Sequence, residues 1–353
     1  MFPLLTLFSL LFFLLFYPCQ PGRPPPELAP SPATVVTVKN GSYTWHGFQR
    51  FLGARRGSRI SGMAELKKYF NRFGYLGFQD GNVTDVFDTR LESAVAAYQA
   101  KLGLQVTGRF DSETLSQMMS PRCGMRDAMQ PMHAAMHYVY FPGKPRWARP
   151  IPMTLTYAFS PENLVGYLSL EDIRGAFKRA FARWASVIPV SFTETDTYSF
   201  ADIKIGFYRG DHGDGEPFDG VLGVLAHAFS PESGKFHLDA AETWAVDLES
   251  EKSTVAIDLE SVATHEIGHL LGLAHSPVKE SVMYPSLKPR AKKADLKLDD
   301  IEAVQALYGS NPNFKFASSM ESDISSNQAI DFRVRSYRKL SILFPILVLY
   351  SSM

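Results

Sequence analysis

The chain has 353 residues, of which 45% are hydrophobic and 20% charged, and its 36 basic residues balance 36 acidic ones. This is an ordinary globular composition with room for two domains. The zero formal net charge gives no reason to expect nucleic acid as a partner.

The first segment, residues 1–22, is predicted to be a signal peptide. It is almost entirely apolar up to a Pro-Cys-Gln sequence, and the apolar run is short for a membrane span. Removal of this segment would take Cys19 with it and leave Cys123 as an unpaired thiol in a secreted protein, which calls for an explanation. Sequons at Asn40 and Asn82 predict N-glycosylation, which is compatible with secretion.

A proline-rich stretch, residues 20–34, leads into a region with helical spacing between residues 45 and 119. Apolar residues there recur every three or four positions in three runs. The runs are 63–70, ended by Gly74; 91–102, ended by Gly103; and 115–119, opened by the cap-like Asp111. The sequence therefore predicts a small three-helix domain.

From Ile151 onward the pattern changes to a mixture of strands and helices. Strands are predicted at 153–159, 190–194 and 201–208, and helices at 169–188 and 299–308. Ser169 opens a capping-box-like helix start, and Gly309 is expected to end the last helix. We therefore predict an α+β fold in which one long helix packs on a mixed sheet.

The segment Thr264–His275 carries the strongest chemical signal. His265 and His269 are four residues apart, which stacks them on one face of a helix, and Gly272 can turn the chain so that His275 joins them. Three imidazoles leave one tetrahedral position of a zinc ion open, as in a catalytic site. Glu266 would act as the general base of peptide hydrolysis. The alternative, ordinary core histidines, is weakened by the extension to His275.

Four further residues suggest a second, closed zinc site. His212, Asp214, His227 and His237 lie between the third predicted strand and the zinc motif, and together they would complete a tetrahedral structural site. The alternative is a set of unrelated surface histidines in loops.

The end of the chain has the composition of a lipid-anchor signal. A polar linker, residues 311–339, contains the small residues Ser325, Ser326 and Asn327, and a hydrophobic tail follows at 340–353. This pattern predicts a glycosylphosphatidylinositol (GPI) anchor attached at one of the three small residues. The alternative is an uncleaved apolar terminus.

The extended zinc motif is that of metzincin proteases. Met283 lies where that superfamily has its Met-turn, and Ser276 after the third histidine resembles the matrixin (matrix metalloproteinase) branch. Residues 45–310 resemble plant-type matrixins, and no haemopexin-like domain is expected after them. The resemblance implies a metzincin catalytic domain at 138–310, with a mixed, mostly parallel twisted sheet and three helices.

The resemblance also implies that residues 23–137 are a pro-region. Its helical unit resembles peptidoglycan-binding-like modules, and residues 121–127 resemble the matrixin cysteine switch. In that switch the thiol, here Cys123, occupies the open zinc position, and an ion pair between Arg122 and Asp127 braces the loop. The family generally has Val and Pro where this chain has Met125 and Arg126, so a second arginine could compete for the aspartate.

By the same resemblance, one loop is expected to bind Ca²⁺ through oxygen ligands. The implied ligands are Asp219, Gly220, Leu222, Val224, Asp239 and Glu242, with Asp202 at a possible second calcium site. The alternative is a set of solvated acidic residues. Residues 222–229 are expected to form an apolar edge strand that pairs with an extended substrate. Residues 284–298 are expected to line the pocket for the residue after the scissile bond, which the family prefers bulky and apolar.

These observations predict a secreted, monomeric zinc endopeptidase made as a latent zymogen. Its expected partners are extracellular protein or peptide substrates, an activating protease and, through the anchor, the outer face of the plasma membrane; an extracellular-matrix location is the other possibility. Two alternatives remain at this stage. The helical unit could make the chain a cell-wall carbohydrate-binding protein, and the histidine clusters could make it a metal buffer.

Overall fold

The computed structural model describes residues 45–77, 83–127, 139–150 and 152–315. The predicted signal peptide, the asparagines of both glycosylation sequons and the C-terminal tail with its candidate anchor residues lie outside these ranges. Within them, no helix has the length and apolarity that crossing a bilayer requires.

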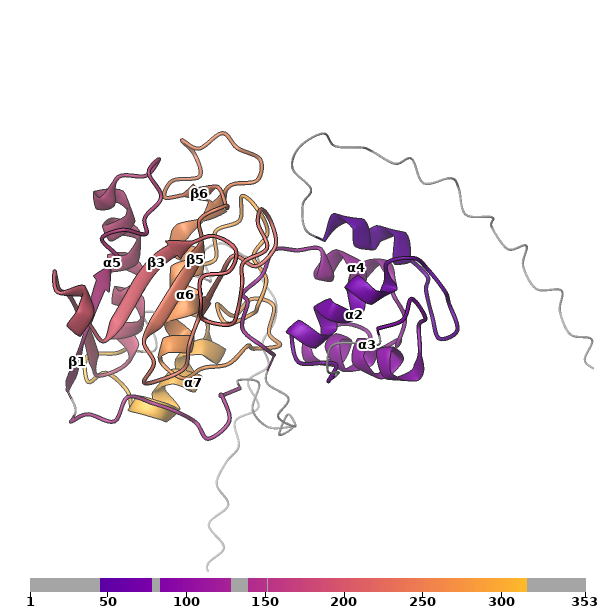
Figure 1. Ribbon diagram of the computed structural model, residues 1–353. Helices are drawn as coiled ribbons and strands as arrows, with labels where there is room; N and C mark the ends of the chain where they lie inside the picture. Colours follow the sequence, from indigo (N-terminus) through magenta and orange to yellow (C-terminus); the bar gives the residue numbers. More distant parts are fainter. Residues whose placement is uncertain (1–44, 78–82, 128–138, 151, 316–353) are drawn as a thin grey trace, which may run out of the picture.

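The described chain forms a helical unit beside a larger unit of helices and strands (Figure 1). The helical unit consists of η1 (His46–Phe51), α2 (Met63–Arg72), α3 (Thr89–Lys101) and α4 (Ser112–Met118). Asp111 caps α4 as predicted, because its carboxylate accepts a hydrogen bond from the Thr114 amide at 2.8 Å. Asp88 caps α3 in the same way through Leu91, at 2.9 Å. The predicted three-helix unit is confirmed.

Aromatic rings fill the core of the helical unit. Tyr69 lies at its centre, with ring-centre distances of 5.1 Å to Trp45, 5.7 Å to Phe48 and 4.7 Å to Phe73, all in edge-on arrangements. Edge-to-face pairs add to the stabilisation that comes from burying these large rings. A unit of this size needs such dense apolar contacts to hold its helices together.

The larger unit is built on a five-stranded sheet with the strand order β2-β1-β3-β5-β4. Its strands are β1 (Met153–Phe159), β2 (Val190–Glu194), β3 (Ile203–Tyr208), β4 (Ala226–Ala228) and β5 (Lys235–Asp239). Only β4 runs antiparallel to its neighbour. The other elements are α5 (Leu170–Val187), η2 (Tyr198–Phe200), α6 (Leu259–Leu270), α7 (Leu298–Tyr308) and a two-stranded sheet of β6 (Trp244–Ala245) and β7 (Ile257–Asp258). The predicted α+β fold with a mostly parallel sheet and three helices is confirmed.

One expectation for the sheet needs correction. Residues 222–229 do not form a continuous strand, because Leu222 adopts a left-handed conformation with φ of 60° and regular pairing begins only at Ala226. The segment does lie at the edge of the sheet, as predicted.

The zinc-motif helix α6 is held in the core on all sides. Every one of its residues is buried, and α5 packs along it. The indole of Trp184 in α5 donates a hydrogen bond to the carbonyl of Thr264 at 2.9 Å. Gly268 allows this close packing, since a Cβ there would meet Met283 Sδ at 2.2 Å and Trp184 at 3.1 Å.

The turn after α6 depends on Gly272. This residue has φ of 102°, and a Cβ on it would lie 2.1 Å from the carbonyl oxygen of Pro145. The turn carries the chain back, so that His275 lies next to the two histidines of the helix. Gly272 therefore sets the position of the third histidine, as the sequence predicts.

We expect Gly272→Ala to destabilise the protein by about 3 kcal/mol or more, because it adds a backbone clash to positive-φ strain. The matched control is Gly143→Ala, where φ is 83° but no atom lies within 4 Å of the new Cβ; strain alone should cost about 1 kcal/mol. Denaturant unfolding of the full chain measures both. If both variants lost the same free energy of unfolding, the clash with Pro145 would not contribute to the effect of Gly272→Ala.

Candidate active site and metal centres

Three buried histidines converge behind the segment that contains Cys123. The Nε2 atom of His269 lies 3.1 Å from that of His265 and 3.2 Å from that of His275. The Sγ atom of Cys123 lies 3.4 Å from the same His269 atom. One ligand atom from each of the four residues fits within 4.8 Å of all the others.

Hydrogen bonds on the far side of each ring set the direction of the lone pairs. The Nδ1 atom of His265 lies 2.7 Å from the Val282 carbonyl oxygen, and that of His269 lies 2.8 Å from the Leu273 carbonyl oxygen. Because a carbonyl can only accept, these Nδ1 atoms donate, and each Nε2 atom presents a lone pair to the cluster.

The cluster has the chemistry of a zinc site. Burial and, next, the neighbouring imidazoles lower the pKa of His265 and His269, so both rings stay neutral. Neutral rings that direct lone pairs at one another from about 3 Å repel unless a cation lies between them. Three nitrogens and one sulfur are a usual donor set for tetrahedral zinc.

Glu266 lies next to this cluster and is fully buried. Within the described chain neither of its carboxylate oxygens has a hydrogen-bond partner. Burial raises the pKa of Glu266 to about 8. The thiol of Cys123 has a pKa raised well above its ordinary value, first by burial and then by Glu266. The geometry thus places an unpaired carboxyl group beside the metal-binding atoms.

The segment around Cys123 pairs with the larger unit on both of its sides. Along one side, the Arg122 amide donates to the Gly223 carbonyl at 3.0 Å and the Gly124 amide donates to the Ala226 carbonyl at 2.8 Å. Along the other side, the Cys123 amide donates to the Pro285 carbonyl at 2.8 Å. Residues 122–124 therefore lie across the site in an extended conformation, as a peptide bound by strand addition would.

A buried ion pair braces this segment. Arg122 Nη2 lies 2.8 Å from Asp127 Oδ1, and both side chains have no exposed surface. Asp127 Oδ1 also lies 2.7 Å from His275 Nδ1. Burial alone would raise the pKa of Asp127, but Arg122 and His275 more than offset it and hold this pKa below the ordinary value. Arg126 is exposed, so the competition for Asp127 that the sequence suggested does not occur.

A second cluster lies on the other side of β4. The cross-strand pair His227–His237 brings two imidazoles together, and the loop after β3 adds His212 and Asp214. Asp214 Oδ2 lies 2.7 Å from a ring nitrogen of each strand histidine and 2.9 Å from His212 Nε2. One oxygen cannot accept three well-directed hydrogen bonds, whereas a shared cation satisfies all four groups. Burial lowers the pKa of His227 to about 4, which keeps it neutral as a ligand must be.

Comparison with known proteins gives consistent results. The family model described as Matrixin matches residues 146–309, and a peptidoglycan binding domain model matches residues 60–118. The chain is 59% identical to Metalloendoproteinase 4-MMP of Arabidopsis thaliana, with 77% of this chain and 80% of the relative aligned. It is 52% identical to Metalloendoproteinase 1-MMP of the same plant, over 89% and 88% of the two chains. Metalloendoproteinase 1 of Glycine max is 42% identical, over 77% and 91%.

The chain belongs to the matrixin family. It is a metalloendoproteinase of that family with an N-terminal helical pro-domain. The two histidine clusters of this matrixin are consistent with zinc binding.

The loop expected to bind calcium in this matrixin gathers three acidic side chains. Backbone amides of the loop donate to them: Gly220 to Asp239 at 3.1 Å, Leu222 to Glu242 at 2.7 Å and Val224 to Asp219 at 2.7 Å. Burial raises the pKa of Glu242 to about 8, and its Oε2 atom has no hydrogen-bond partner in the described chain. These three acidic side chains do not belong to either metal-like cluster of the described residues, so calcium binding by this loop stays a prediction.

Asp202 does not join that loop. Both of its oxygens accept hydrogen bonds from Arg149, at 2.5 and 3.0 Å, and one also accepts from the Thr156 amide at 2.8 Å. Neither metal-like cluster found in the described chain includes this residue. The structure thus gives no support to a second calcium site at Asp202.

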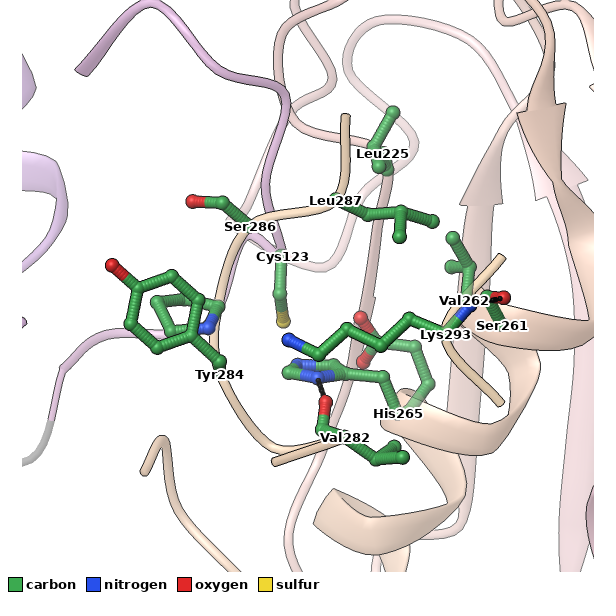
Figure 2. A pocket seen from close by; sticks show the side chains of 12 residues that line it. Cys123, Leu225, Ser261, Val262, His265, Val282, Tyr284, Ser286, Leu287 and Lys293 are labelled. Carbon is green, nitrogen blue, oxygen red and sulfur yellow. Dashed lines mark hydrogen bonds between the residues drawn. The ribbon is translucent and has the colours of Figure 1, made fainter. Parts of the chain in front are cut away.

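Sequence reasoning missed two contributors to the site. Tyr75 of the pro-domain donates to Asp127 Oδ2 at 2.6 Å, and the Phe73 ring lies 3.7 Å beneath the Arg122 guanidinium carbon. Lys293 lies in the pocket beside His265 and Glu266 (Figure 2). Neither Tyr75 nor Phe73 belongs to a motif, and only the spatial contact identifies them. Lys293 and residues 284–287 lie within residues 284–298, which the sequence analysis expected to line this pocket.

We expect the purified full chain to contain two zinc ions, which metal analysis by mass spectrometry would measure. His269→Ala and His227→Ala should each remove about one ion, because they disrupt different clusters. Loss of the closed cluster should also lower the thermal unfolding midpoint, since such sites contribute folding energy. A single variant that removed both ions would contradict the assignment of two separate sites.

Proposed function

We propose that this matrixin is a secreted zinc endopeptidase that is made as a latent zymogen and cleaves extracellular proteins. The observation that supports this proposal best is the position of residues 122–124, which lie across the cleft with the Cys123 thiol facing three imidazoles and Glu266. The pro-segment thereby covers the groups that hydrolysis would need.

The catalytic zinc would be held by His265, His269 and His275, with Cys123 as the fourth ligand in the zymogen. When bound, zinc supplies Lewis acidity, which makes water more acidic and a carbonyl group more electrophilic. Glu266 would take a proton from the attacking water and later deliver it to the leaving amine.

Substrate binding would use the backbone groups that the pro-segment now occupies. The Gly223 and Ala226 carbonyls accept from residues 122 and 124, and the Leu225 amide donates to the Arg122 carbonyl at 2.9 Å. An extended peptide chain in the same place could form equivalent bonds with any sequence, and side-chain pockets would then provide selectivity.

The remaining ligands and the location are part of this proposal. His212, Asp214, His227 and His237 would hold the structural zinc. Asp219, Asp239 and Glu242, with the carbonyls of Gly220, Leu222 and Val224, would hold Ca²⁺. Asn40 and Asn82 would carry glycans. A GPI anchor at Ser325, Ser326 or Asn327 would keep the enzyme at the outer face of the plasma membrane after an activating protease has removed the pro-region.

A carbohydrate-binding function is the second candidate, because the pro-domain matches a peptidoglycan binding domain model. Trp45 and Phe48 are each only 6% exposed and pack against Tyr69, so these rings do not offer free faces for a sugar. Saturable binding of the full chain to cell-wall glycans would support this candidate independently of proteolysis.

We expect Glu266→Gln to retain zinc and to lower kcat/KM for peptide cleavage by about a thousandfold or more, because it removes the general base. The amide has nearly the same shape as the carboxyl group, so the fold should persist. Cleavage of a quenched fluorescent peptide and zinc analysis test both statements. Near-normal cleavage by this variant would rule out Glu266 as the base.

We expect Cys123→Ser to make the uncleaved full chain active, because a neutral hydroxyl is a much weaker zinc ligand than a thiolate. The matched control is Met125→Ala, which alters the same segment but leaves the thiol in place and should remain latent. Peptide cleavage is measured while electrophoresis verifies that the chain is intact. A Cys123→Ser chain as silent as the control would contradict latency through the thiol.

A further inference from the structure

A narrow pocket opens beside Glu266, between α6 and the segment that follows the Met-turn (Figure 2). Most of its wall is apolar and is formed by Leu225, Val262, Val282, Tyr284, Pro285 and Leu287. Its position next to the proposed base makes it the site for a substrate side chain adjoining the bond that is cut.

Lys293 introduces a cation into this apolar wall. Figure 2 shows its side chain reaching into the pocket with the amine turned toward the side where Cys123 and His265 lie. The Lys293 amide donates to Ser261 Oγ at 2.7 Å, which fixes the backbone from which the side chain starts. Its Nζ atom lies 5.0 Å from the centre of the Tyr284 ring.

The amine has no anionic partner of its own. Among the described residues its contact is with the Tyr284 ring, and it forms no hydrogen bond or ion pair. Of the two serines in the lining, Ser261 Oγ donates to Asp258 at 2.5 Å, whereas Ser286 Oγ accepts from Gln117 of the pro-domain at 2.6 Å, a bond that is lost when the pro-domain leaves. Apart from the reacting groups, Lys293 is thus the charged group of the pocket that is left to interact with a ligand, beside the Ser286 hydroxyl.

The carboxylates that act on this amine from neighbouring segments form no ion pair with it. Asp300 accepts hydrogen bonds from Ser281 and from the Val282 amide, at 2.5 and 2.9 Å. Burial lowers the pKa of Lys293 to about 8, and the more distant Asp300 and Glu280 act in the opposite direction.

We propose that Lys293 determines which side chain this pocket accepts from the substrate residue that follows the scissile bond. The preferred side chain has an apolar stem and a hydrogen-bond acceptor at its tip, and glutamate fits best. This inference rests on the proposed protease function and departs from the bulky apolar residue that the family resemblance implies. The apolar wall accommodates the methylene groups, and the carboxylate meets the amine. An entirely apolar side chain would instead leave a desolvated cation without a partner.

Three peptides that differ only at this residue test the proposal: glutamate, glutamine and norleucine, which have similar lengths. The full chain is activated by limited proteolysis between residues 127 and 139, and kcat/KM is measured for each peptide. Lys293→Met should lower the ratio of glutamate to norleucine cleavage by about tenfold or more, because it removes a buried polar partner. Lys293→Arg, which keeps the cation, should preserve the preference.

Lys288→Met is the matched control, since it removes the same charge from an exposed position of the same segment that does not line the pocket. The proposal would be overturned if the ratio of glutamate to norleucine cleavage in Lys293→Met stayed within about twofold of the wild-type ratio. An equal fall of this ratio in Lys288→Met would also overturn it. Cleavage of the norleucine peptide verifies that Lys293→Met is folded, and Lys293→Gln gives the same comparison if it is not. Failure of the protease proposal would look different, because the wild-type enzyme would then cleave none of the three peptides.

Discussion

The structure depends on the convergence of three neutral imidazoles in a space that excludes water. Nε2 atoms about 3.1 Å apart, each presenting a lone pair, are unfavourable neighbours unless a cation joins them. Several features far apart in the chain maintain this arrangement. α6 is buried on every side, Gly272 allows the turn to His275, and the Val282 and Leu273 carbonyls orient two of the rings. The fold thus provides a rigid frame for groups that would not assemble on their own.

Local patterns in the sequence predicted the parts of this frame that depend only on residues close together in the chain. The four-residue spacing of His265 and His269 places them on one face of any α-helix, and a glycine at 272 permits φ of 102° whatever surrounds it. The strands 153–159 and 190–194 agree with the structure to the residue, because each has alternating or β-branched residues between clear breaks.

Features that depend on contacts distant in sequence could not be predicted in the same way. The edge strand proved shorter than expected, because Leu222 adopts φ of 60° and regular pairing begins only at Ala226. Asp202 looked like a free carboxylate until the fold brought Arg149 to it. Lys293 follows another lysine in a polar stretch, and nothing in that stretch distinguishes the residue whose amine enters the pocket.

Asp127 connects the latency that we propose with the metal site. Its Oδ1 atom is shared by Arg122, which braces the pro-segment, and by His275, whose ring belongs to the zinc cluster. A carboxylate that accepts from the far nitrogen of a ligating histidine fixes its tautomer and raises its basicity. Departure of residues 122–127 would therefore remove two things at once: the thiol from the cluster and the carboxylate partner of His275. The same step that opens the site to substrate would also make His275 a less basic ligand. The metal environment of the zymogen would then differ from that of the mature enzyme in two ways: the zymogen has the Cys123 thiol as a ligand, and it has the hydrogen bond from His275 to Asp127.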